Sequence, residues 1–117
     1  MKLRIYLADL THTSGLLPAT EAFPLNVGLI ASYCKKNFNN NVDIKLFKFP
    51  KDLKEAIDEK LPHVLGCSNY TWNCNLSYYF ASYVKSIDKN IVTVFGGTNY
   101  PFDKHNQKKK MKMNKNC

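Results

Sequence analysis

The chain has 117 residues, enough for one small domain and too few for two. Its formal net charge of +8 at first suggests a nucleic-acid partner, but six lysines and no acidic residue lie in residues 104–117, so residues 1–103 are nearly balanced. No apolar run approaches the length of about 20 residues that a membrane-spanning helix needs.

The first third of the sequence predicts one strand, a long loop and one helix. Apolar and polar residues alternate over residues 2–8, as in a strand. Pro18 and Pro24 stiffen the loop over 9–23, and Pro24 then suits the first turn of a helix over 24–38. Its apolar positions recur every three or four residues, as in a helix: Leu29, Ile30, Tyr33, Cys34 and Phe38.

The rest of the folded part repeats the same alternation. Asn39–Asn41 ends the first helix, and a second strand follows over 42–47. A second helix begins at Pro50 and is closed by Pro62, and a short apolar strand covers 63–67. The third helix carries one apolar stripe (Leu76, Tyr79, Phe80, Tyr83, Val84 and Ile87), with Asn73 as its expected amino-terminal cap.

A fourth strand over 91–95 completes a β-α-β-α-β-α-β pattern, which requires a parallel sheet with right-handed crossovers. We expect a flavodoxin-like, Rossmann-like α/β fold with the strand order 2-1-3-4. A complete domain of that kind has a fifth strand and two more helices, for which residues 96–117 contain no pattern. The sequence therefore predicts an incomplete domain over 1–103, with its fourth strand as an unpaired apolar edge that invites self-association.

Candidate binding residues follow the predicted strands. Ligands of open α/β sheets bind at the carboxyl ends of the strands. The loop after the first strand offers Asp9, Thr11, His12 and Gly15 at that edge, and the later strand ends offer Gly66–Asn69 and Gly96–Asn99. Thr71 and Trp72 follow the third strand. The indole of Trp72 either covers a ligand or fills the top of the core, and burial is the commoner fate of aromatic side chains.

The remaining features indicate no catalytic site. The four cysteines have no metal-site spacing, and the three histidines are scattered along the chain. The amino terminus runs straight into a strand without a signal peptide, so we expect a reduced, cytoplasmic protein. The lysine-rich tail over 104–117 lacks apolar periodicity and is expected to be disordered, which makes a role in nucleic-acid binding secondary.

Residues 2–103 resemble the cobalamin-binding-like domain found at the amino terminus of radical S-adenosylmethionine enzymes. The resemblance rests on the helix start Phe23-Pro-Leu-Asn-Val-Gly-Leu-Ile-Ala-Ser-Tyr33, on Pro62-His-Val-Leu-Gly-Cys-Ser68 followed by Thr71-Trp-Asn73, and on Val94-Phe-Gly-Gly-Thr98. It implies a cobalamin-binding or docking module that pairs with a radical S-adenosylmethionine domain.

The resemblance also implies roles for single residues. The cobalamin motif Asp-x-His-x-x-Gly corresponds here to Asp9-x-x-His12-x-x-Gly15, with His12 as the candidate ligand of cobalt. One additional residue moves a loop carboxylate by up to about 3.5 Å, which removes Asp9 from its place beside the imidazole. Ser68, with Asn69 and Thr71 as alternatives, matches the position near the nucleotide tail of the cofactor, and Gly96 and Gly97 match the glycines that the tail passes.

This chain contains no Cys-x-x-x-Cys-x-x-Cys triplet, so we expect no radical chemistry and no catalytic activity from it alone. Two other functions stay open. Thr11-His-Thr-Ser-Gly15 is similar to a hydroxyl-rich phosphate loop, which would fit a small flavodoxin-type electron carrier. A tail-driven, non-specific nucleic-acid binder is the second alternative.

Overall fold

The computed structural model describes residues 2–11, 13–14, 17–18, 25–97 and 105. Its main sheet has four parallel strands in the order β4-β1-β5-β6: β1 (Leu3–Ala8), β4 (Val42–Phe47), β5 (Val64–Ser68) and β6 (Val92–Gly96). This is the predicted order 2-1-3-4, since the second, third and fourth expected strands are β4, β5 and β6. The α/β, flavodoxin-like fold is confirmed.

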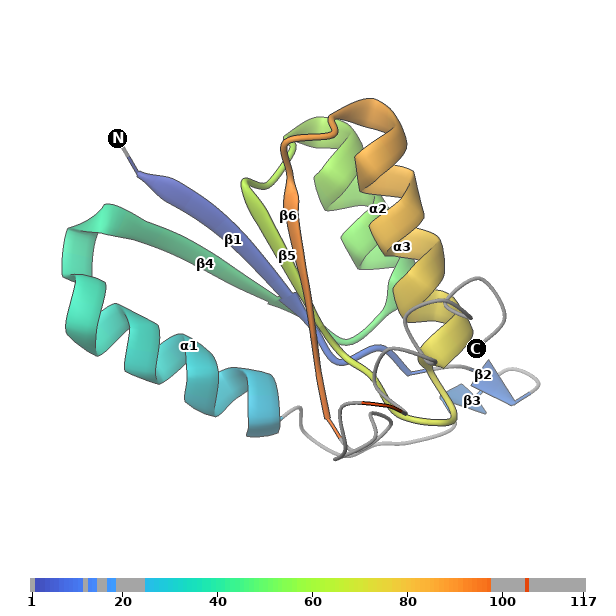
Figure 1. Ribbon diagram of the computed structural model, residues 1–117. Helices are drawn as coiled ribbons and strands as arrows, with labels where there is room; N and C mark the ends of the chain where they lie inside the picture. The colour runs from blue at the N-terminus through green and yellow to red at the C-terminus, as the bar shows by residue number, and fades with distance from the viewer. Residues whose placement is uncertain (1, 12, 15–16, 19–24, 98–104, 106–117) are drawn as a thin grey trace.

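Helices flank both faces of this sheet (Figure 1). The helices α2 (Pro50–Glu59) and α3 (Cys74–Ile87) cover one face, and α1 (Leu25–Phe38) lies alone on the other. Asn39, with a φ of 48°, turns the chain out of α1 into the short 3-10 helix η1 (Asn39–Asn41), as asparagine residues can. Each predicted helix and strand is present, with ends within a few residues of the expected positions.

The two faces of the sheet are packed very unequally. The larger core lies between the sheet and the pair α2 and α3, and its most deeply buried side chains are Tyr6, Leu10, Leu53, Ile57, Leu65 and Val84. The core beneath α1 consists of four buried residues: Leu7, Val27, Ala31 and Ile44. Because α1 packs on β4 and β1, it leaves the same face of β5 and β6 uncovered.

The apolar positions of α1 are largely uncovered. Of the five that repeat at helical spacing, Leu29, Ile30, Tyr33 and Phe38 are at least half exposed, and Cys34 is half-buried. The buried residues of α1 are Val27 and Ala31. The apolar spacing predicted the helix correctly, but the neighbour that would bury its full width is absent from the described residues.

The expected stripe of α3 and its cap also need correction. Phe80 and Val84 are buried as predicted, whereas Tyr79 and Ile87 are about half exposed. Asn73 precedes α3 but makes no side-chain capping bond. Its Oδ1 accepts from the Tyr70 backbone N–H at 2.8 Å, and its Nδ2 donates to the Leu10 carbonyl at 3.2 Å, so the side chain ties two loops together instead.

The loop after β1 is not wholly irregular. Two short strands, β2 (Thr13–Ser14) and β3 (Leu17–Pro18), pair antiparallel within it. Thr13 pairs with Pro18, and Ser14 pairs with Leu17. At the opposite end of the chain, His105 is exposed, and the rest of the lysine-rich tail lies outside the described residues.

Tyr6 connects the buried centre of the sheet to the end of α2. Its ring is 1% exposed, and its hydroxyl donates to the Lys60 carbonyl at 2.7 Å. We expect Tyr6→Phe to lower the free energy of unfolding by about 1 kcal/mol, because it removes this partly buried hydrogen bond. Urea unfolding measures the change. Tyr79→Phe, at a ring that is 54% exposed, is the matched control and should leave stability unchanged.

Candidate functional site

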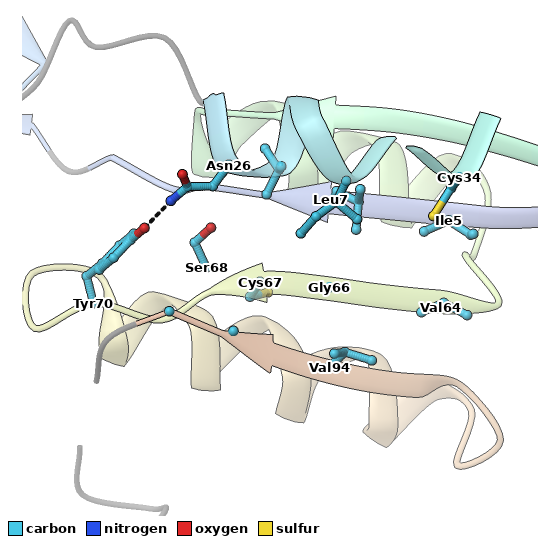
Figure 2. A pocket seen from close by; sticks show the side chains of 14 residues that line it. Ile5, Leu7, Asn26, Cys34, Val64, Gly66, Cys67, Ser68, Tyr70 and Val94 are labelled. Carbon is cyan, nitrogen blue, oxygen red and sulfur yellow. Dashed lines mark hydrogen bonds between the residues drawn. The ribbon is translucent and has the colours of Figure 1, made fainter. Parts of the chain in front are cut away.

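An apolar groove of about 580 Å³ lies on the uncovered face of the sheet. Figure 2 shows it between α1 on one side and β5 and β6 on the other. Its volume falls within the range of about 300–1,000 Å³ that is typical of small-molecule sites. It extends to the carboxyl ends of β5 and β6, the edge where open α/β sheets bind ligands.

None of the described residues that line the groove is charged. Side chains that alternate along the strands form its floor, with α1 as one wall, and the apolar and thiol-bearing members are Ile5, Leu7, Val27, Ile30, Cys34, Val64 and Val94. Cys67 also borders the groove, but its side chain packs in the larger core on the other face, where burial raises the pKa of its thiol to about 12. The groove therefore suits an uncharged, apolar ligand group and disfavours a bare phosphate or metal ion.

Gly66 keeps the floor of the groove low. A Cβ atom at this position would lie 2.7 Å from Cδ2 of Leu7, so a larger residue would displace the leucine. The glycine interrupts an otherwise apolar buried strand, which is a common sign of close approach by a neighbour.

Polar groups gather at the mouth of the groove. Ser68, at the end of β5, lines it, and its backbone carbonyl accepts from the Ser77 hydroxyl at 3.2 Å. Across the mouth, the Asn26 amide of α1 donates to the Tyr70 hydroxyl, as the dashed line in Figure 2 marks. This bond joins α1 to the loop after β5 and frames one end of the groove.

The two adjacent glycines at the end of β6 have different roles. Gly97 has a φ of +118°, and a Cβ there would lie 2.9 Å from the Asn69 carbonyl oxygen. The backbone path therefore requires glycine at this position. At Gly96 a Cβ would meet nothing within 4 Å, so the fold does not require glycine there. Because Gly96 has no side chain, the mouth of the groove stays open at this position.

Asn69 is a buried polar residue at the same edge. Its backbone N–H donates to the Gly96 carbonyl at 2.6 Å, which connects the ends of β5 and β6. Asn69 is 4% exposed, and its Oδ1 is a buried acceptor with no hydrogen-bond partner among the described residues. A buried acceptor without a donor costs about 1–3 kcal/mol.

The structure brings together part of the predicted site. Ser68, Gly96 and Gly97 line the groove, and Asn69 lies beside them. Thr71 is exposed in the turn before α3 and does not line the groove. Trp72 is 57% exposed and stacks on Tyr70 at a centroid distance of 4.6 Å, so the expectation that it is buried is wrong.

The loop after β1 contributes less than expected. Asp9 and Thr11 do not line the groove, and their backbone N–H groups donate to the carbonyls of Phe47 and Lys48, both at 2.9 Å. His12 and Gly15 lie outside the described residues. In the part of the chain that is described, no cluster of three or more His, Cys, Asp or Glu side chains could hold a metal ion.

Two polar groove residues, Asn26 and Tyr70, were not predicted from the sequence. Gly66 was predicted, as the first residue of the strand end Gly66–Asn69. No local sequence pattern indicates Asn26 or Tyr70, because their hydrogen bond depends on how α1 is placed against the loop after β5.

The comparisons with known proteins add no relative. No family model matches the chain, and no curated protein matches it. Among the described residues, no helix is both long enough and apolar enough to cross a membrane.

The two glycines give a direct test of the mouth. We expect Gly97→Ala to lower the free energy of unfolding by about 1–3 kcal/mol, because alanine is strained at that φ and meets the Asn69 carbonyl. Gly96→Ala, one residue earlier, should change it by less than about 0.5 kcal/mol. Urea unfolding of both variants checks the difference, and equal losses would contradict the assignment.

Asp9 gives a pH-dependent prediction. Burial raises the pKa of Asp9 above its ordinary value of 3.8, although nearby Lys48 opposes the rise. The folded state therefore binds its proton more tightly than the unfolded state, and this residue makes stability fall as the pH rises above 3.8.

We expect Asp9→Asn to be more stable than the original chain at pH 7 and to lose this advantage below pH 3.8. Urea unfolding at both pH values measures it, with Asp43→Asn, at an exposed position of β4, as the control. A variant that is less stable at pH 7 would show that the carboxylate is needed in its charged form.

Proposed function

We propose that this chain is a cobalamin-binding module of the type found beside radical S-adenosylmethionine domains, with the uncharged groove as the site for the nucleotide tail of the cofactor. The observation that carries the proposal is the coincidence of that groove with Ser68, Gly96 and Gly97. The resemblance in sequence assigned these three residues to the tail independently of any cavity.

The residues present fit the tail of this cofactor. Its benzimidazole ring is flat, uncharged and apolar, which matches a lining without charge and a floor lowered by Gly66. Its sugar and phosphate are polar and would stay at the mouth, near Ser68 and the amide and hydroxyl of Asn26 and Tyr70.

Within this proposal the chain binds and orients, and it performs no chemistry of its own. When bound, cobalamin would supply a cobalt centre capable of group transfer at the carboxyl edge of the sheet. The apolar floor would exclude water from the tail, and the glycines at the end of β6 would let the ligand approach the backbone closely. His12 is the candidate ligand of cobalt that the resemblance in sequence implies.

Gly96→Leu is the sharpest test, because the fold leaves open space at Gly96 and the new side chain would enter the mouth. We expect the original chain to bind hydroxocobalamin saturably, as followed by its visible spectrum. Gly96→Leu should weaken binding about tenfold or more, which corresponds to about 1.4 kcal/mol.

Ser82→Leu, at an exposed position of α3 on the opposite face of the sheet, is the matched control and should bind normally. A spectral shift that His12→Ala removes would identify the ligand of cobalt; binding without that shift would leave the tail site alone. A folded chain that binds no cobalamin would refute the proposal.

A further inference from the structure

We propose that a second copy of this chain covers the bare face of β5 and β6 by laying the outer side of its α1 on it. Two copies related by a two-fold axis would then enclose both α1 helices between their two sheets. The interaction needs no cofactor, and it stands independently of the proposed function.

The recessed half of this interface is the uncovered sheet. Parallel sheets are normally covered on both faces, because their strands are apolar on both sides. Here Val92 and Val94 of β6 are 53% and 51% exposed, and α1 stands over the neighbouring strands β1 and β4 instead. The uncovered width of two strands, with α1 as a wall on one side, is the space that one helix occupies.

The protruding half lies on α1 itself. Leu25, Leu29 and Tyr33 are four residues apart, so they form one row along the helix. They are 60%, 61% and 66% exposed, because the helix turns Val27 and Ala31 towards its own sheet. A row with this spacing is the ridge with which helices pack into grooves.

One chain therefore carries both a ridge and a recess, side by side on the same face. A two-fold interface requires such self-complementarity, since each copy presents the same patch to the other. The row on α1 and the facing valines of β6 are uncharged, and Lys36, on the same side beyond the row, is in the last turn of α1, where its ammonium can stay in solvent. A second copy thus matches the recess in shape, in polarity and in symmetry.

The carboxyl-terminal stretch of this chain is a poorer occupant. Residues 104–117 contain six lysines and no apolar residues at helical spacing. Burying such a segment against valines would cost the solvation of its charges. The row on α1 has no such cost.

Sedimentation equilibrium of the full 117-residue chain, in reducing buffer and without cobalamin, tests the proposal. We expect a concentration-dependent dimer. Leu29→Glu on the ridge and Val94→Lys in the recess should each weaken it about tenfold or more, because each leaves a charge in an apolar contact. Both positions are more than half exposed in the single chain, so the variants should keep its fold and its circular dichroism.

Ile87→Glu is the matched control, since this residue is 48% exposed on α3 at the opposite face. It should dimerise normally. A chain that stays monomeric up to its solubility limit would overturn the proposal, as would a dimer that survives both Leu29→Glu and Val94→Lys, which would point to another surface such as the edge of β6.

A last expectation rests on the proposed function. If cobalamin and the second copy use the same groove, hydroxocobalamin should shift dimers to monomers, because ligands that exclude one another are linked with opposite sign. A chain that dimerises but binds no cobalamin refutes the cofactor site and leaves the dimer standing. Binding without any loss of dimer would show that the two do not share the groove.

Discussion

The coverage of a parallel sheet is the constraint on which the rest of this structure depends. The strands β1 and β5 are central and apolar, so they need a layer of helices on each face. α2 and α3 supply one layer and build the main core around Tyr6, Leu53 and Val84. On the other face α1 serves two strands of four, and the groove, the exposed row on α1 and the bare valines of β6 all follow from that shortage.

The sequence predicted the elements well because each carries its own periodic signal. Four apolar strands alternating with three helices permit few topologies once crossovers are right-handed, so the strand order followed from local pattern alone. β4 was predicted with its observed ends, because turn residues precede it and a proline follows shortly after. These are properties that a short stretch of chain possesses by itself.

The extent to which α1 is buried does not follow from its own sequence. Its apolar spacing predicts the helix, but it does not say which elements pack against it. Leu29 and Tyr33 are exposed because the described residues place no second helix beside α1. The expectation that Trp72 is buried was wrong for a related reason: this residue lies in a turn and stacks on Tyr70 instead of entering the core. Asn73 ties two loops because its side chain found closer partners than the helix end.

The candidate site likewise contains residues that local sequence predicts and residues that depend on the packing of α1. Ser68, Gly96 and Gly97 could be predicted because the ends of parallel strands must meet at one edge, whatever covers the sheet. Asn26 and Tyr70 could not, since their bond depends on the placement of α1 over the neighbouring strands. The two glycines at the end of β6 differ in whether the backbone requires them. Gly97 is explained by the backbone alone, whereas the backbone does not require Gly96. A glycine that the fold does not need, at the mouth of an uncharged groove, is the residue whose substitution separates a binding site from an apolar surface that binds no small molecule.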